Sequence, residues 1–332
     1  MKKLLFFILI LIVGCNGSNN AKVSLVGEAQ GTYYSIIYFD AQERDFQIEI
    51  DSLLTDFDKS VSLWVPNSIL SRINNNEADI EIDNYFMDNF NISKDVSEQT
   101  NGAFDFTIGK LIKAWGFGYD ENKTIEPNMI DSLLNLSGYK KVKLEEGKII
   151  KEDPRISFDF NAVAQGYSVD MIGLFLESKG ISNYLIDIGG EVKAKGTKPD
   201  GIKWKVGIEK PAEHKNDSRD LEAVAELLDL SIATSGNYRK FYEEDGIRYS
   251  HTIDPKTGYP AKNTLLSVSV LHKSTAYADA YATALMVMGF EKAKSFVEKE
   301  NDLEAFFIFS TEDSFETYAT TGFKDVIIEE FE

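Results

Sequence analysis

The chain has 332 residues, a formal net charge of −19 and a single cysteine. A surface this acidic argues against nucleic acid and anionic lipid as partners, and one cysteine excludes an internal disulfide or a cysteine-rich metal site. Hydrophobic residues make up 43% of the sequence, which excludes a disordered chain and suits one large domain or two tightly joined lobes.

The N-terminus has the pattern of a bacterial lipoprotein signal. Two lysines precede an apolar run, Leu4 to Val13, that is too short to span a membrane comfortably. A small residue then stands directly before Cys15, which would be lipidated after cleavage. We therefore expect a signal peptide over 1–14, a lipid-anchored tether over 15–22 and the folded domain over 23–332. An ordinary signal peptide followed by a chance cysteine is the alternative.

Hydrophobic spacing predicts a mixture of strands and helices in the domain. Strands are expected over 23–39, 60–64, 142–151, 155–160, 184–188, 191–196, 204–209, 223–233, 265–271, 305–309 and 315–319. Helices are expected over 46–57, 69–74, 85–100, 128–138, 162–179, 276–288 and 291–300. Because the two types are interspersed without regular alternation, we expect a compact, two-lobed α+β fold and not a doubly wound one.

Two stretches carry residue types that suit a charged ligand. In Ala276 to Leu285, Asp279 and Thr283 stand four apart and share one helix face, where their oxygens suit magnesium or calcium. The alternative is an Asp favoured by the helix dipole and a Thr bonded to its own backbone. In Asp159 to Asp170, an acid is delivered to a helix start that can bind phosphates, with Gly166 allowing close approach. Simple helix packing, with Asp159 as a cap, is the alternative.

Weaker signals surround these stretches. Gly189-Gly190 fits a hairpin turn better than a phosphate cradle, because it lacks the spacing of a nucleotide-binding fingerprint. The segment from Ala233 to Tyr238 reads as a polar loop that lines a site or caps a helix. Trp64 is either a core residue or a platform on which a flat ligand stacks. No zinc spacing, P-loop or nucleophile elbow is present.

His251 precedes a turn-forming segment, Asp254 to Gly258, so its imidazole is expected at the mouth of a shaped loop. Histidine is the side chain best suited to proton transfer near neutral pH. The alternative is a hairpin with an incidental histidine. The other two histidines, His214 and His272, are interpreted as surface residues.

In combination and in this order, the motifs resemble the ApbE family, the FAD:protein FMN transferases. The resemblance covers nearly all of the mature chain and includes the lipoprotein signal. Its segments are residues 31–34, 62–64, 67–74, 100–111, 115–118, 159–170, 188–191, 233–236, 251–260, 278–279 and 283–285.

The resemblance implies a magnesium-dependent reaction. Such enzymes cleave the pyrophosphate of FAD, attach FMN to a threonine hydroxyl of another protein and release AMP. The resemblance assigns the metal to the Ala162 backbone oxygen and the side chains of Asp279 and Thr283. It assigns FAD contacts to Gln30, Trp64, Ala103, Phe104, Asp105, Asp159, Gln165 and Ile253. We assign His251 as the base for the threonine hydroxyl, because the unperturbed pKa of histidine is about 6.5.

This chain departs from the family pattern in one segment. Many members have Lys or Glu where it has Gln165, and a glycine-rich turn where it has Phe160-Asn161. A neutral amide interacts less with phosphate than a lysine would. Two further functions stay open: an FAD pyrophosphatase that gives FMN and AMP, and a passive flavin-binding lipoprotein.

The expected partner is a membrane redox subunit whose acceptor threonine lies in an Asp/Ser-Gly-Ala-Thr-like segment. Self-modification is not expected, because the nearest segment of this chain, Ser231 to Ser235, has Ile232 in place of the glycine. We expect the protein in the bacterial cell envelope, anchored through Cys15 and facing the periplasm, most simply on the inner membrane.

Overall fold

A computed structural model describes residues 20–116, 126–211, 220–237, 241–244, 247–250, 252–312 and 314–331. For residues 127, 241–244 and 247–250 it describes the backbone alone.

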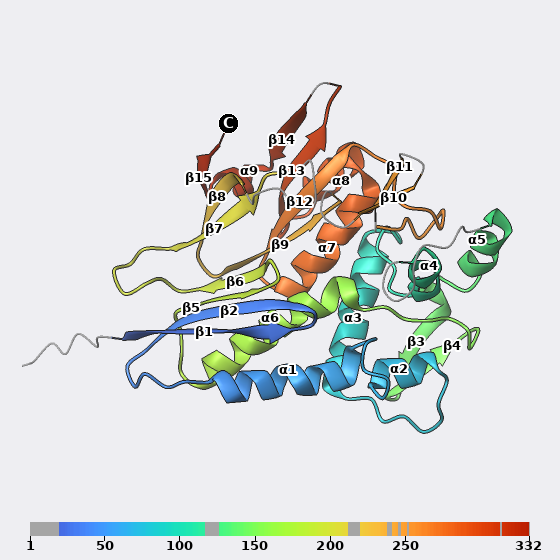
Figure 1. The fold of residues 1–332 in the computed structure, drawn as a ribbon, viewed down its shortest axis with the longest axis horizontal. Coiled ribbons are helices and arrows are strands. Elements are labelled where there is room, and N and C mark those ends of the chain that lie inside the picture. Colours follow the sequence, from blue (N-terminus) through green and yellow to red (C-terminus); the bar gives the residue numbers. More distant parts are fainter. Residues whose placement is uncertain are drawn as a thin grey trace, which may run out of the picture.

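The described chain is organised around one antiparallel sheet of eight strands in the order β1-β2-β5-β6-β9-β12-β13-β14 (Figure 1). These strands are β1 Ala21–Ala29, β2 Thr32–Asp40, β5 Tyr184–Ile188, β6 Glu191–Lys195, β9 Leu230–Gly236, β12 Leu265–His272, β13 Glu304–Ser310 and β14 Phe315–Ala319. Every neighbouring pair is antiparallel. Alternate residues of β2 are buried, as expected for a strand with different environments on its two faces.

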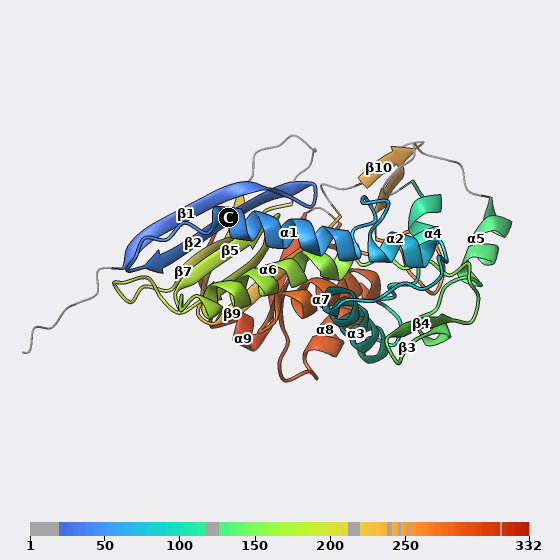
Figure 2. The same ribbon diagram turned by 90° about the horizontal axis from the view of Figure 1, so that it is seen from below.

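Helices cover one face of this sheet. The helices of the whole described chain, of which α1, α3, α6, α7 and α8 pack with the main core, are α1 Gln47–Val61, α2 Ile69–Asn74, α3 Asn84–Gln99, α4 Gly109–Ala114, α5 Pro127–Leu134, α6 Asn161–Ser178, α7 Thr275–Met288, α8 Phe290–Val297, α9 Thr321–Lys324 and the 3-10 turn Tyr139–Lys141. In both ribbon views α6 and α7 lie side by side (Figures 1 and 2). They carry the main hydrophobic core together with α1, α3 and the sheet.

A smaller sheet covers the other face. It consists of β7 Trp204–Glu209, β8 Leu221–Leu227 and β15 Ile327–Glu330, in the order β15-β8-β7. A second hydrophobic core lies between the two sheets, with Trp204 as its largest fully buried side chain. The central strands of the eight-stranded sheet are therefore covered on both faces.

A second lobe lies at one end of the molecule (Figures 1 and 2). It contains α2, α4, α5 and the hairpins β3 Val142–Glu145 with β4 Lys148–Lys151, and β10 Phe241–Glu244 with β11 Ile247–Ser250. A third, small core formed by Ile108, Leu111, Trp115, Ile130 and Ile253 holds its end together. This arrangement agrees with the two-lobed α+β fold expected from the sequence.

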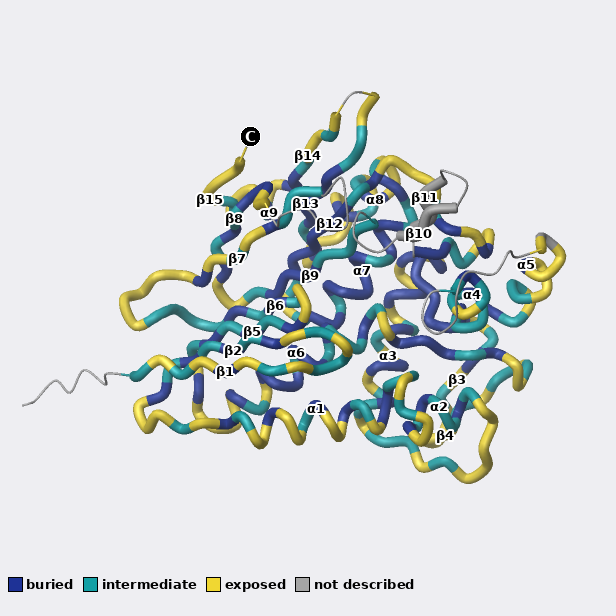
Figure 3. Tube along the Cα trace, in the orientation of Figure 1, coloured by how far each residue is buried: buried dark blue, intermediate teal, exposed yellow. Residues whose placement is uncertain are grey.

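Helix α7 is the most enclosed helix of the described chain, as the dark tube in Figure 3 shows. Its alanines at 276, 278, 280, 282 and 284 are fully buried. Small side chains let a helix approach its neighbours closely on every side, so this composition places α7 between α6 and the sheet. The functional side chains on α7 therefore stand on a rigid support.

The structure corrects several of the sequence predictions. The segment 223–233 is not one strand but parts of β8 and β9, separated by a turn at Asp229, which has φ 51°. Residues 142–151 form a hairpin and not one strand, because Glu146 and Gly147 both have positive φ and turn the chain. Ser60 and Val61 extend α1 and are not part of a strand over 60–64. In place of a strand over 155–160 there is a single parallel bridge between Ser157 and Ile108.

Candidate functional site

One cleft of about 1210 Å³ lies between the two lobes and brings together every described residue that the sequence assigned to the site. These residues are Gln30, Trp64, Ala103, Phe104, Asp105, Asp159, Ala162, Gln165, Ile253, Asp279 and Thr283. His251 lies outside the described residues; Thr252 and Ile253, which follow it, line the cleft. Segments more than 200 residues apart in sequence therefore meet at one surface.

The candidate cation ligands come from the crossing of α6 and α7. Asp279 and Thr283 both line the cleft, as their spacing on one helix face predicts. The Asp279 Oδ2 accepts a hydrogen bond from the Gly166 backbone N–H at 3.1 Å, and the Thr283 hydroxyl lies 3.3 Å from that of Ser235. Asp279 is only 7% exposed, so its carboxylate is held by the protein and not by bulk water.

The first turn of α6 is distorted at the third candidate ligand. Ala162 has φ −94° and ψ 22°, outside the helical region. In a regular helix, the Gly166 N–H would donate to the Ala162 carbonyl four residues earlier. Here it donates to Asp279, so the carboxylate of α7 contacts the first turn of α6 next to the distorted residue. Ala162 itself lines the cleft.

The donor chemistry fits a hard divalent cation. A carboxylate, a hydroxyl and a backbone carbonyl supply oxygen alone, which magnesium prefers. Among the described residues no group of three or more His, Cys, Asp and Glu side chains could hold a metal ion. A magnesium ion here would therefore complete its coordination with water and substrate phosphate oxygens, its usual arrangement in phosphate-transfer sites.

The turn between β1 and β2 offers a second indication of a bound ligand. Gln30 adopts φ 54°, uncommon for a residue other than glycine, and its side chain lines the cleft. Its Nε2 is buried and has no hydrogen-bond partner in the structure. A buried donor of this kind costs free energy unless a ligand or water accepts its hydrogen bond. The position fits a polar ligand.

Gln165 holds the β5–β6 turn. Its Nε2 donates to the Ile188 carbonyl at 2.7 Å and to the Glu191 carboxylate. A Cβ on Gly189, which has φ 60°, would lie 2.4 Å from that nitrogen. Gly189-Gly190 is thus a hairpin turn, as the sequence indicated, packed against Gln165 at the edge of the cleft.

Asp105 and Asp159 both line the cleft, but their carboxylates differ in their hydrogen-bond partners. Asp105 accepts from the Thr107 N–H, the Thr107 hydroxyl and the Tyr139 N–H, so its side chain is committed to the fold. Burial raises its pKa, and these bonds partly offset that. Asp159 accepts from the Asn161 N–H at 2.8 Å, and burial raises its pKa to about 6. Asp159 thus caps the start of α6 and also faces the cleft.

Trp64 lies in the loop after α1, with its side chain 56% exposed. It lines the cleft and is not a core residue. An indole that is exposed at the edge of a cleft gives a flat ligand a surface to stack on. The exposure therefore favours the platform over the core interpretation.

Sequence reasoning missed several charged residues of the cleft. Asp58, Asp187, Glu191, Lys205 and Glu209 all line it. Lys205 is the only lysine or arginine among the described lining residues, so the cleft is strongly acidic. For Asp58 a signal existed, because it interrupts the apolar face of α1 formed by Leu54, Phe57 and Val61. Burial raises its pKa.

The interpretation of His272 as a surface residue is wrong. It is partly buried at the end of β12, where its Nδ1 accepts from the Ser274 N–H at 3.0 Å. Burial lowers its pKa, so the ring is neutral at pH 7 and serves the start of α7. His214 lies outside the described residues.

Residues 1–19, with the signal and Cys15, also lie outside the described residues. None of the helices in the described part of the chain has the length and apolar character needed to cross a membrane.

The comparisons with known proteins point to one family. The model of the ApbE family matches residues 30–307. The FAD:protein FMN transferase of Vibrio cholerae is 36% identical over 326 residues, which cover 95% of this chain and 96% of the relative. That of Escherichia coli K12 is 33% identical over 317 residues, 92% of this chain and 89% of the relative.

Solved structures agree. The flavin transferase ApbE from Vibrio cholerae superposes with a TM-score of 0.83 at 34% identity, over 92% of this chain and 99% of the other. The apo form of the Pseudomonas stutzeri flavinyl transferase ApbE gives 0.84 at 31% identity, over 92% and 97%. The fold, the cleft and the motifs that line it thus have one explanation, which is that this chain belongs to the ApbE family.

Proposed function

We propose that this protein transfers FMN from FAD to a threonine hydroxyl of another protein and releases AMP. Membership of the ApbE family, whose similar members are FAD:protein FMN transferases, supports the reaction class. One observation of the structure carries the proposal: described residues from ten of the eleven segments that carry the resemblance line a single cleft. Chance motifs would have no reason to converge.

The chemical step breaks a phosphoanhydride bond of FAD and forms a phosphoester bond to the acceptor. The acceptor hydroxyl oxygen bonds to the FMN phosphorus of FAD, and the bond from that phosphorus to the bridging oxygen breaks. AMP leaves with the bridging oxygen. We assign the hydroxyl proton to His251, which the sequence places directly before the cleft-lining Thr252 and Ile253.

The acidic cleft must accept a pyrophosphate that is itself negatively charged. Magnesium, when bound, would neutralise charge on the pyrophosphate and on the leaving AMP. Asp279, Thr283 and the Ala162 carbonyl would hold it, because they offer oxygen donors where α6 and α7 meet. The near absence of basic side chains from the described lining makes a cation necessary for this substrate.

The remaining residues position the nucleotide. Trp64 offers an aromatic face for a flat ring, and Gln30 offers a buried amide donor. Asp105 acts indirectly, since its carboxylate accepts from Thr107 and from the Tyr139 N–H and so fixes residues 103–107. Asp159 holds the distorted start of α6.

We further propose that the acceptor is a membrane redox subunit with an Asp/Ser-Gly-Ala-Thr-like segment, and that lipidation of Cys15 holds the enzyme at the periplasmic face of the inner membrane. The signal-like residues 1–14 support the anchor. Labelling of Cys15 by a fatty-acid probe in cells, lost in a Cys15→Ser variant, tests it.

The reaction is tested with purified protein, FAD and magnesium chloride, with and without a peptide that contains Ser-Gly-Ala-Thr. We expect AMP release that depends on the peptide, together with a gain of one FMN in the peptide mass. A peptide with Ala in place of the threonine should remain unmodified. AMP release without peptide would show an FAD pyrophosphatase, and bound FAD with no AMP would show passive binding; either result contradicts the proposal.

His251→Ala separates the base from the binding groups. If His251 accepts the hydroxyl proton, the variant loses transfer and retains FAD binding, measured by the quenching of flavin fluorescence. A variant that transfers FMN at the wild-type rate would remove His251 from the mechanism.

A further inference from the structure

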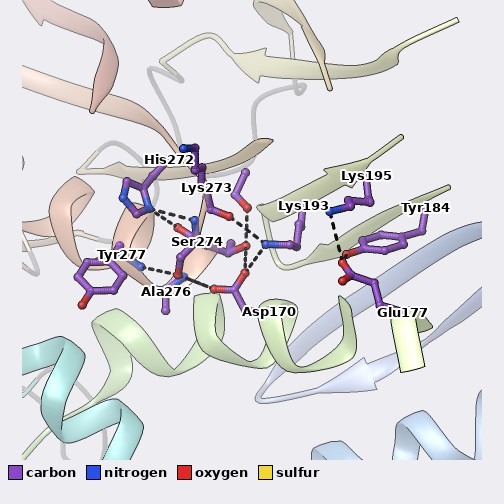
Figure 4. A network of polar contacts seen from close by, with 12 residues as sticks. Asp170, Glu177, Tyr184, Lys193, Lys195, His272, Lys273, Ser274, Ala276 and Tyr277 are labelled. Atoms are coloured by element: carbon purple, nitrogen blue, oxygen red, sulfur yellow. Dashed lines mark hydrogen bonds and ion pairs between the residues drawn. The ribbon is translucent and has the colours of Figure 1, made fainter. Parts of the chain in front are cut away.

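We infer that Asp170 is a positioning residue: its carboxylate fixes the start of α7 against α6 and so sets the place of Asp279 at the cleft. The inference rests on the proposed function only in naming magnesium as the ion at that place. The network around Asp170 lies outside the cleft lining and is shown in Figure 4.

Residues on one face of α6 determine how the two helices meet. Ala162, Gly166 and Asp170 are spaced by four and therefore share a face of the helix. Gly166 lies in direct contact with the α7 backbone, since a Cβ there would be 2.4 Å from the Thr275 oxygen. Asp170 contacts the first residues of α7, and Gly166 bonds to Asp279 one turn further along. The next turn of α6 in that direction brings Ala162 to the cleft.

The Asp170 carboxylate is saturated with donors from the start of α7. Its Oδ2 accepts from the Ser274 hydroxyl at 2.7 Å and from the Ala276 N–H at 3.1 Å. Its Oδ1 accepts from the Thr275 hydroxyl at 3.0 Å. A negative charge at this helix end also interacts favourably with the helix dipole. The charge therefore acts on the first turn of α7, through two hydroxyls and one backbone N–H.

Two further contacts tie this helix start to the sheet. The Lys193 ammonium on β6 lies 2.8 Å from Asp170 Oδ1 and donates to the Lys273 carbonyl at 3.0 Å (Figure 4). The Thr275 hydroxyl also lies 2.8 Å from that of Ser231 on β9. Lys193 and Asp170 are only 18% and 16% exposed, so water screens the pair little. The start of α7 is thus held from α6, β6 and β9 together.

The hydrogen bonds from Asp170 to the start of α7, which we call the Asp170 clamp, affect the cleft because α7 itself connects the two places. Asp279 follows Ala276 by three residues in the same helix, and its carboxylate bonds back to α6 through Gly166. Loss of the clamp at Ala276 allows α7 to shift or rotate against α6. Because the candidate ligands come from both helices, such a shift separates the Ala162 oxygen from Asp279 and weakens their joint hold on a cation.

Asp170→Asn tests the role. The amide keeps the size of the side chain but loses the charge and places an NH₂ group toward donors that it cannot satisfy. We expect the magnesium concentration that gives half of the maximal rise in melting temperature to increase about tenfold. This is the lower end of the loss in metal affinity when a residue that orients metal ligands is changed. The magnesium concentration is read from the melting temperature in saturating FAD as magnesium chloride is added, so the measurement needs no turnover.

Matched variants separate positioning from general damage. Asp95→Asn removes another carboxylate bonded to α7, but this one is held only by the hydroxyl at the tip of the Tyr277 side chain, at 2.9 Å. It should leave the magnesium midpoint unchanged. Lys193→Met removes the ion pair but leaves the Asp170 bonds to α7, so its midpoint should shift less than that of Asp170→Asn. Ser274→Ala, which removes one donor, keeps the test possible if Asp170→Asn does not fold, and should shift the midpoint in the same direction.

The possible results are distinct. A folded Asp170→Asn protein with a wild-type magnesium midpoint overturns the inference, as does a wild-type protein whose melting temperature does not respond to magnesium. An equal shift in Asp95→Asn also overturns it, because any lost contact to α7 would then suffice. A wild-type protein that responds to magnesium but transfers no FMN overturns the proposed function alone.

Discussion

At each end of the α6–α7 contact, an Asp carboxylate of one helix accepts a hydrogen bond from a backbone N–H of the other helix. The two ends differ in what else surrounds the carboxylate. At one end Asp170 of α6 accepts from the Ala276 N–H of α7. At the other end Asp279 of α7 accepts from the Gly166 N–H of α6. The Asp170 end is closed by hydroxyl donors and by Lys193. The Asp279 end faces a cleft whose described lining contains a single basic side chain, Lys205.

The difference lies in where the balancing positive charge comes from. Lys193 is part of the chain, so the Asp170 end is complete without a ligand and serves the fold. The residues at the Asp279 end offer oxygen donors toward the cleft, so the balancing charge there is expected from a bound cation.

We call the Asp279 end, which faces the cleft, the open end, and the Asp170 end the closed end. The largest effect of a substitution is expected at the open end. Asp279→Asn keeps the acceptor for Gly166 but removes the charge that would hold magnesium. We expect AMP release at 1 mM magnesium to fall by at least about a hundredfold, which corresponds to about 3 kcal/mol of lost stabilisation of the transition state. Initial rates with the acceptor peptide measure this.

The stability of the same variant shows whether the two ends differ as argued. If the Asp279 charge serves a ligand, the free energy of unfolding of Asp279→Asn without magnesium should be at least as large as that of the wild type. The closed end should show the opposite, with Asp170→Asn less stable than wild type. Equal losses of stability at both ends would contradict the comparison.

The second largest effect is expected at Gly166, where α6 and α7 touch between these two ends. Gly166→Ala places a Cβ 2.4 Å from the Thr275 oxygen and 2.7 Å from its carbon. Backbone atoms cannot move aside as a side chain can, so the helices must separate. We expect a loss of about 3 kcal/mol in the free energy of unfolding, at the upper end for overpacking, measured by urea denaturation.

Gly173→Ala, on the same helix, is the control. Its added Cβ would meet the Tyr184 hydroxyl at 2.8 Å and a Lys193 carbon at 3.2 Å, which are side-chain atoms. We therefore expect a clearly smaller loss than at Gly166. If the two alanine variants are equally destabilised, close backbone contact is not what makes Gly166 necessary.

Local patterns explain which parts of this structure the sequence predicted. The spacing of Asp279 and Thr283 placed both on one face of α7, where both line the cleft. The described site residues that the family resemblance supplied all line the same cleft. Each of these inferences needs only the helical or extended repeat, or a set of motifs in order.

The missed features depend on contacts between distant segments. Asp170 looks like any polar residue in a helix, because its partners at Ser274 and Ala276 lie 104 and 106 residues away. Close approach at Gly166 was expected, but for a ligand, and the structure shows that α7 occupies the space. His272 looked exposed because nothing in its own strand shows that it packs beside Tyr277 and Tyr281.

The third effect concerns Asp159, which is 8% exposed at the start of α6. Burial raises its pKa to about 6 from an ordinary value of 3.8. Between these pH values the folded protein holds a proton that the unfolded chain has released, so stability falls as pH rises from about 4 to about 6. Asp159→Asn keeps the acceptor for Asn161 and removes the titration.

We therefore expect Asp159→Asn, without FAD and magnesium, to be more stable than wild type at pH 7 by up to about 3 kcal/mol. Below pH 4 the two proteins should unfold alike. Urea denaturation at pH 4, 6 and 8 measures the difference. A constant difference at all three pH values would show that the Asp159 charge is not the cause.

The smallest effect on stability is expected at Trp64, which also lines the cleft. Trp64 is 56% exposed, so Trp64→Ala should change the free energy of unfolding by less than about 0.5 kcal/mol. If the indole stacks on a ring of FAD, the dissociation constant should rise about tenfold, a typical loss for one stacked base. Trp64→Phe keeps an aromatic face and should lose less. Quenching of FAD fluorescence measures both variants, and a wild-type dissociation constant for Trp64→Ala would remove Trp64 from the binding surface. Because stability and binding should separate most completely here, the Trp64 variants test most directly whether the cleft end binds a ligand while the Asp170 end serves the fold.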